Sequence, residues 1–79
     1  MFHDGLVEIR KRFGLAVQKH RQAEGISQEE LAMRIGADQA YVSRIEAGKM
    51  NVTLITAKQL AAALGVDFFE FIDPPGDSN

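Results

Sequence analysis

The side chains that could do chemistry in this chain form no catalytic pattern. There is no cysteine, and the two histidines, His3 and His20, are far apart in the sequence. An enzyme needs titratable groups that converge in one pocket, and the scattered carboxylates here show no recurring spacing. A single histidine on an apolar stripe is more often a packed residue than a metal ligand. We therefore predict a protein that is not an enzyme, with no metal, no other cofactor and no small-molecule ligand.

A more informative set of residues lies in the stretch DQAYVSRIEAGK, residues 38–49. Only Val42 and Ile45 are plainly apolar, so a helix here would be anchored along one narrow stripe. At 3.6 residues per turn, the opposite side carries short or flexible side chains. These are Gln39, Ala40, Ser43, Arg44 and Ala47. In a DNA major groove Gln can pair with adenine and Arg with guanine, while Ala can touch a thymine methyl group. The alternative is a plain solvated helix face.

The surrounding residues match the requirements of a helix-turn-helix over residues 27–48. A small residue, Ala32, lets the second helix cross closely over the first, and Gly36 permits the positive φ of a tight turn. Four apolar residues hold the two helices on the core: Leu31, Ile35, Val42 and Ile45. In this context we favour DNA over solvent as the partner of the polar face.

Start and stop signals divide the chain into five helices, and no segment alternates as a strand would. Good N-caps precede the later helices, which are predicted to begin after Ser27, Asp38, Thr53 and Asp67. Glu30 and Ile26 complete a capping box and an apolar staple around Ser27. Glycines follow the first four helix-like runs: Gly25, Gly36, Gly48 and Gly65.

The first helix is predicted over residues 6–24, with an apolar stripe that points to the core. The stripe contains Leu6, Ile9, Phe13, Val17 and His20. Gly14 lies inside this run and costs about 1 kcal/mol relative to Ala in a helix. We therefore expect the part before Gly14 to be a separate or frayed segment.

Length and composition indicate one small globular domain, residues 1–79. With 46% apolar and 25% charged residues, the chain has the composition of a folded domain. The helix pattern makes it a compact all-α fold of five helices, in which residues 53–72 close the core. The chain contains no apolar run long enough for a signal peptide or a membrane span, so a cytoplasmic location is expected.

The net charge of −2 argues against a nucleic-acid partner, because phosphate binding usually needs a basic surface. The distribution of charge weakens that objection. Residues 1–49 contain eight Lys or Arg against seven Asp or Glu, whereas residues 50–79 contain one Lys against four acids. The basic potential thus lies in the same half as the helix-turn-helix.

These motifs resemble the phage-repressor or XRE-type helix-turn-helix family, whose fold is the lambda-repressor-like bundle. The resemblance rests on RQAEGISQEELAMRIGADQAYVSRIEAGKMN and on LITAKQLAAALGVDFFEFI, and covers about residues 13–72. The stretch DQAYVSRIEAGKMNVT and the short chain look most like the controller proteins of restriction-modification systems. Phage repressors, antitoxins and sporulation regulators share the same module.

The resemblance implies a role for individual residues. Base-contacting positions match Gln39, Ala40, Ser43 and Arg44. Phosphate-contacting positions match Gln28, Lys49 and Asn51, and Tyr41 is either a further phosphate contact or a ring packed at the rim. Arg21 and Glu46 match a partly buried ion pair between the first and third helices. Some residues of this region depart from the family pattern: His20 replaces a core leucine, Met50 replaces a basic loop residue, and Ala40 offers no hydrogen bond.

The C-terminal helices suggest a homodimer. Phe69 and Ile55 occupy positions that are usually polar in the family, and exposed apolar residues at such positions favour a subunit interface over isolated surface residues. We predict that the interface comprises Ile55, Phe68, Phe69 and Ile72. Two recognition helices about 34 Å apart would then contact the two half-sites of a palindrome.

The expected function is a sequence-specific transcriptional regulator that binds a palindromic double-stranded DNA operator. The regulatory signal would be the protein concentration, which sets the fraction of dimer. A controller-like protein would regulate its own expression. Activation through RNA polymerase and repression both stay open. The alternative is an antitoxin-like protein-interaction module with the same fold, whose apolar C-terminal helices bind a different protein.

Overall fold

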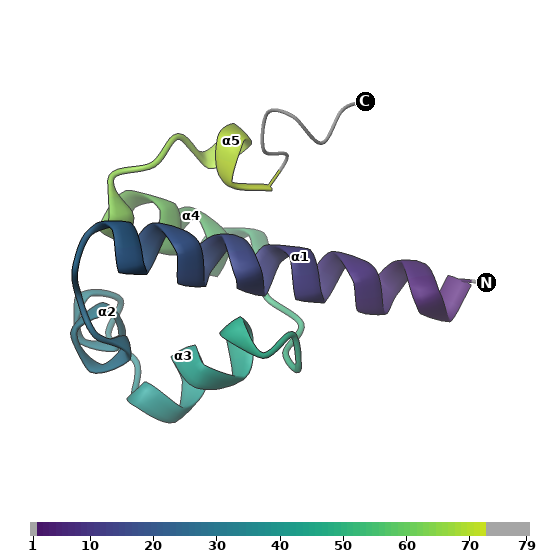
Figure 1. Cartoon of the computed structure of the whole chain (residues 1–79), viewed down its shortest axis with the longest axis horizontal. Coiled ribbons are helices and arrows are strands. Elements are labelled where there is room, and N and C mark those ends of the chain that lie inside the picture. Colours follow the sequence, from purple (N-terminus) through teal and green to yellow (C-terminus); the bar gives the residue numbers. More distant parts are fainter. Residues whose placement is uncertain (1, 73–79) are drawn as a thin grey trace.

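The computed structural model describes the backbone of residues 2–72 and the side chains of residues 8–71. This part of the chain is all-helical, which confirms the predicted fold class. The helices are α1 (Phe2–Ala23), α2 (Gln28–Arg34), α3 (Gln39–Glu46), α4 (Leu54–Leu64) and α5 (Phe68–Ile72). In Figure 1, α1 runs along the length of the molecule. Helices α2 and α3 lie below it, α4 lies behind it and α5 lies above it.

The predicted caps position the short helices. The side chains of Ser27, Asp38 and Thr53 each accept a hydrogen bond from the backbone N–H three residues on, at 2.9 to 3.1 Å. The Asp67 carboxylate accepts one from the N–H of Phe69 at 2.8 Å. The glycines that follow the helices all have positive φ: Gly25, Gly36, Gly48 and Gly65. Local capping therefore sets the starts and ends that the sequence indicated.

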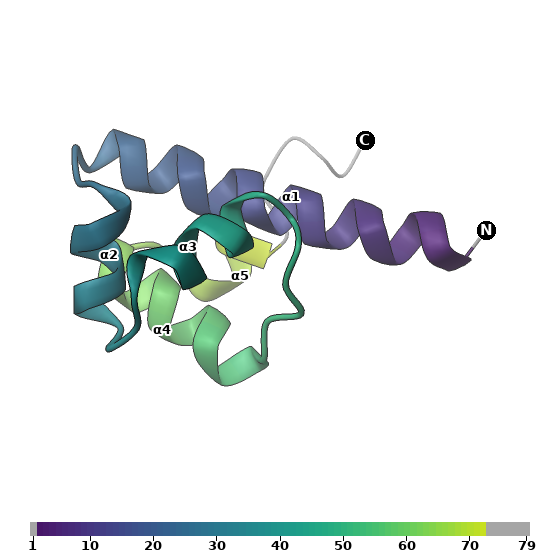
Figure 2. The ribbon, with the colours of Figure 1, turned by 90° about the horizontal axis from the view of Figure 1, so that it is seen from below.

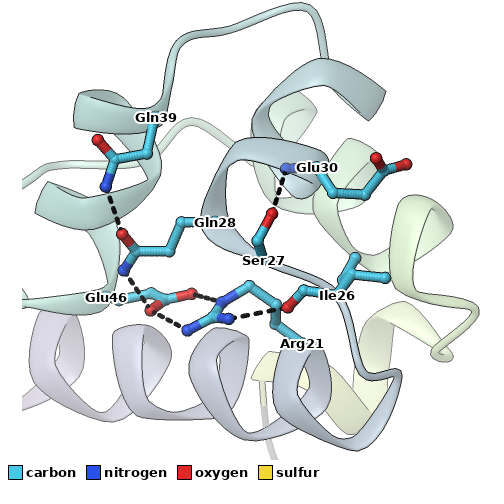
Figure 3. A network of polar contacts seen from close by, with 7 residues as sticks. All are labelled: Arg21, Ile26, Ser27, Gln28, Glu30, Gln39 and Glu46. Carbon is cyan, nitrogen blue, oxygen red and sulfur yellow. Dashed lines mark hydrogen bonds and ion pairs between the residues drawn. The ribbon is translucent and has the colours of Figure 1, made fainter.

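The reciprocal half of the capping box at Ser27 is absent, which corrects one prediction. Glu30 does not reach back to the cap. Its carboxylate instead accepts a hydrogen bond from the Arg34 guanidinium one turn further along α2, at 3.2 Å, and Figure 3 shows it pointing away from Ser27. An oppositely charged partner four residues ahead competes with the backbone N–H for the same carboxylate.

The core lies where the five helices meet. Its largest fully buried side chains are Val17, Leu31, Val42, Ile45, Leu60 and Phe71. The ring of Phe13 meets the ring of Phe71 edge to face, with centroids 5.2 Å apart. His20 also lies against Phe71, with a centroid distance of 5.7 Å. His20 is thus a half-buried residue packed at the edge of the core, which accounts for its presence at a position where the family has leucine.

The N-terminal half of α1 differs from the prediction. The helix is continuous through Gly14 and begins at Phe2 rather than near residue 6. Ile9, expected in the core stripe, is 64% exposed. The N-terminal part of α1 extends beyond the body formed by the other helices (Figure 1). The side chain of Leu6 lies outside the described residues. The helix continues through Gly14, and the end of α3 packs against the backbone at this glycine.

Candidate nucleic-acid interface

The third helix has one buried side and one open side. Val42, Ile45 and Glu46 are buried. The open side carries Gln39, Ala40, Arg44 and Ala47, which are exposed, and Ser43, which is half-buried. Figure 2 views the molecule from the side on which α3 lies at the front, with α1 behind it. The division of this helix therefore has the form that its sequence indicated, and the polar face is free to meet a ligand.

The C-terminal end of α3 packs directly on the backbone of α1. A Cβ atom built on Gly14 would collide with the carbonyl oxygen of Ile45 and lie 2.7 Å from that of Glu46. At Gly48, where φ is +74°, an added Cβ would lie 2.8 Å from Cγ of Lys11. Two glycines, one on each chain segment, thus allow α1 and the end of α3 to approach more closely than side chains would permit.

An ion pair links α1 to the last residue of α3. The Nε atom of Arg21 donates to the Glu46 carboxylate at 2.6 Å, and a second guanidinium nitrogen donates to the other carboxylate oxygen at 3.1 Å. Arg21 also donates to the carbonyl oxygen of Ile26 at 2.9 Å. The side chains of Arg21 and Glu46 are only 12% and 3% exposed. The hydrogen bond to Glu46 raises the pKa of Arg21, so the guanidinium stays charged.

Figure 3 shows that this ion pair continues as a chain of hydrogen bonds to the start of α3. The amide nitrogen of Gln28 donates to Glu46 at 2.9 Å, and the amide nitrogen of Gln39 donates to the amide oxygen of Gln28 at 2.6 Å. Sequence reasoning assigned Gln28 to a phosphate and Gln39 to a base, and it missed the bond between them. The first residues of α2 and α3 are adjacent only after the turn has folded.

The chemistry of this chain of bonds orients both amides. An ionised carboxylate only accepts hydrogen bonds, so Gln28 must turn its nitrogen toward Glu46 and its oxygen toward Gln39. Gln39 must then donate with its nitrogen. The amide oxygen of Gln39 and its second N–H are left for a ligand. One acceptor beside one donor is the pattern that pairs with N6 and N7 of adenine.

The flanks of α3 carry the remaining predicted contacts. Lys49 and Asn51 are exposed in the loop that follows the helix. Tyr41 and Met50 are half-buried, and both pack against the hydrophobic core. The Tyr41 ring therefore packs at the rim of the core, which was one of the two roles considered for this residue. The same packing explains why an apolar Met50 replaces the basic residue that is common in the family.

Exposed apolar side chains are found on α4 and α5. Ile55 and Phe69 are 73% and 74% exposed, and Leu54, which the sequence interpretation omitted, is 75% exposed. Phe68 is half-buried and packs on the core, with its ring 5.6 Å from that of Phe69. The side chain of Ile72 lies outside the described residues. Leu54 directly follows the Thr53 cap and precedes Ile55. Two apolar residues in a row at the start of a helix could have indicated that Leu54 is exposed together with Ile55.

Other kinds of site find no support in the described part of the chain. No three His, Asp or Glu side chains gather there as a metal ion would require. None of the helices described is both long and apolar enough to span a bilayer. The polar face of α3 is thus the feature with the most developed geometry for binding.

Comparison with known proteins places the chain among helix-turn-helix proteins. Residues 17–71 match the model of the HTH_3 helix-turn-helix family. The HTH-type transcriptional regulator y4dJ of Sinorhizobium fredii is 38% identical over 72 residues, which cover 91% of this chain and 94% of the relative. The control protein C.MunI of a Mycoplasma species is 39% identical over 64 residues, which cover 80% of this chain and 86% of the relative.

Solved structures show the same similarity. The restriction-modification controller protein C.AhdI of Aeromonas hydrophila superimposes with a TM-score of 0.79 at 39% identity, covering 87% of this chain and 99% of that one. The controller protein C.Esp1396I, solved as a tetramer with its natural 35 base-pair operator, gives a TM-score of 0.73 at 28% identity, covering 82% of this chain and 90% of that one. The chain therefore belongs to the XRE-type helix-turn-helix family of DNA-binding transcriptional regulators, which are not enzymes.

Proposed function

We propose that this regulator binds a palindromic double-stranded DNA operator as a homodimer, and that it controls its own expression as restriction-modification controller proteins do. The single observation that carries the proposal is the oriented amide of Gln39, which lies with exposed Arg44 on the open side of α3. An oriented donor–acceptor pair and a guanidinium on one helix face can distinguish adenine and guanine at two positions of a major groove. Ala40 and Ser43 complete the proposed base-contacting set.

Backbone contacts would hold this face in register on the duplex. Lys49 and Asn51 lie directly after α3, where they can reach phosphates on one edge of the groove. The second N–H of Gln28 can reach a phosphate on the other edge, while its oxygen holds Gln39. The hydroxyl of Tyr41 is a further candidate phosphate donor, because packing of its ring leaves the side chain half-exposed.

We propose that the exposed apolar residues of α4 and α5 form the dimer interface. Ile55 and Phe69 are its centre, and Leu54 extends it. Phe68 supports the ring of Phe69 from the core side. Burial of these side chains between two copies would remove apolar surface from water and place two recognition helices one helical turn of DNA apart. The similarity to C.Esp1396I, which was solved as a tetramer on an operator, supports this assembly.

Protein concentration would then be the regulatory signal. Dimer formation and operator occupancy rise together with the amount of the protein. An operator that overlaps a promoter would make the bound dimer a repressor, and one upstream of it would allow contact with RNA polymerase. Binding to chromosomal or plasmid DNA implies a cytoplasmic location.

Selection of bound duplexes from a random pool tests the proposal. We expect recovery of a palindrome whose half-sites are about one helical turn apart, with adenine and guanine at the positions facing Gln39 and Arg44. Failure to enrich any sequence at low salt would contradict DNA binding and would favour the protein-interaction module.

A substitution in the interface tests the assembly separately. Phe69→Asp places a charge where the proposed dimer buries an aromatic ring, so we expect a shift to monomer in analytical ultracentrifugation and a large loss of operator affinity. Met33→Asp, which places the same charge at an exposed apolar residue of α2, is the control and should stay dimeric. A Phe69→Asp protein that dimerises normally but loses a protein partner would favour the interaction module.

A further inference from the structure

The part of α1 that precedes the family match lies against the end of the recognition helix. The match begins at residue 17, whereas Lys11 is one of the residues that touch Gly48. An added Cβ at Gly48 would be 3.0 Å from Cα and 3.2 Å from the backbone nitrogen of Lys11. The α1 backbone at Lys11 is therefore fixed directly beside Gly48, in the loop that carries Lys49 and Asn51.

The Lys11 side chain starts on the same side of the molecule as that loop. Its Cγ atom is the one nearest to an added Cβ at Gly48, so the aliphatic stem runs along the glycine and Lys11 itself is exposed. Figure 2 shows the loop after α3 passing in front of this part of α1, on the face that α3 presents. A lysine stem packed on backbone with its ammonium group in solvent is well suited to contact an anion.

We propose that Lys11 is a phosphate-binding residue that, together with Lys49, lengthens the DNA contact of each subunit beyond the recognition helix. The partner is the sugar-phosphate backbone of the operator flank, and the proposal rests on the DNA binding proposed above. The contact adds affinity without sequence preference, because phosphates are the same at every position.

The contact with Gly48 reduces the conformational entropy that the Lys11 side chain loses when it binds a phosphate. Lysine side chains on a solvated helix lose conformational freedom when they bind, which reduces the net gain. Here the first part of the Lys11 stem is already held against Gly48. Binding of a phosphate therefore has to fix only the side-chain torsions beyond Cγ.

The test is the salt dependence of DNA affinity for Lys11→Gln, measured with the duplex enriched from the random pool and with a random-sequence duplex of equal length. Each lost phosphate contact lowers the slope of log K against log salt concentration by about 0.9, so a dimer should lose about 1.8. Lys49→Gln should give a similar loss. Lys58→Gln, an exposed lysine on α4, should keep the wild-type slope, and Lys11→Arg should retain most of it.

The outcomes separate this inference from the proposed function. A wild-type slope for Lys11→Gln, with thermal unfolding unchanged, overturns the Lys11 contact and leaves DNA binding standing. A loss confined to the enriched duplex would also overturn it, because a phosphate contact acts on both duplexes. Absence of DNA binding by the wild-type protein would instead refute the proposed function itself.

Discussion

The inner side of α3 packs on the rest of the protein, whereas its outer side is exposed to solvent. The inner side joins the rest of the protein through buried apolar residues, a buried ion pair and a backbone contact at Gly14. The outer side presents Gln39 and Arg44 to solvent, and only Gln39 is tied back by a hydrogen bond. Changes on the inner side should therefore appear as loss of stability, and changes on the outer side as loss of DNA affinity or specificity.

The largest effect is expected from Glu46→Ala. This substitution leaves the Arg21 guanidinium buried without its partner, and breaking such a pair costs about 3–5 kcal/mol. Urea unfolding followed by circular dichroism measures the change. The matched control is Glu30→Ala, which removes the Glu30–Arg34 pair of α2, whose side chains are 40% and 38% exposed. A loss of about 0.5 kcal/mol or less is expected there. Equal losses for the two variants would contradict the distinction between them.

Gly14→Ala should have the next largest effect. In an open helix this change stabilises by about 1 kcal/mol, whereas here the new methyl group meets the carbonyl oxygens of Ile45 and Glu46. These oxygens belong to backbone that cannot rotate away, so we expect a net destabilisation of about 1–3 kcal/mol. Gly25→Ala is a useful comparison, because a Cβ there meets nothing within 4 Å and only the positive φ opposes it. An increase in the melting temperature of Gly14→Ala would show that α1 and α3 can separate without cost.

Arg44→Ala should leave stability nearly unchanged, because the residue is exposed and surface substitutions usually stay within about 0.5 kcal/mol. Affinity for the preferred duplex should fall by about 1–3 kcal/mol, with specificity relaxed at one base pair. Fluorescence anisotropy with the preferred duplex and its single-base variants measures both. Lys49→Ala is the contrast, since losing a phosphate contact should weaken all duplexes alike. Equal losses for Arg44→Ala on preferred and random DNA would rule out a base contact.

Much of the fold could be predicted because its signals are local. The caps at Ser27, Asp38 and Thr53 act within three residues along the chain, so their residue types alone indicate where helices begin. The apolar stripe of α3 is equally local, since helix geometry alone places Val42 and Ile45 on one side. The candidate DNA-contacting face follows as the complement of that stripe.

The errors occurred where a distant segment changed the meaning of a residue. Gly14 was interpreted as a weak point in a helix, although it is the place where α3 rests on α1. Ile9 continues an apolar stripe in the sequence, although its side chain is exposed in the folded chain. In both cases helical periodicity was correct, and it held no information about where the neighbouring helices lie.

The sequence by itself determined the five-helix pattern, the helix-turn-helix and the identity of the residues on the open side of α3, because capping and periodicity are short-range properties. The tertiary structure alone decided that Gln28 orients Gln39, that Glu46 orients Gln28, and that Lys11 lies beside the loop after α3. These pairs join residues from different helices. Their contacts depend on how the helices pack around Val17 and Phe71, and packing geometry is a property of the whole chain.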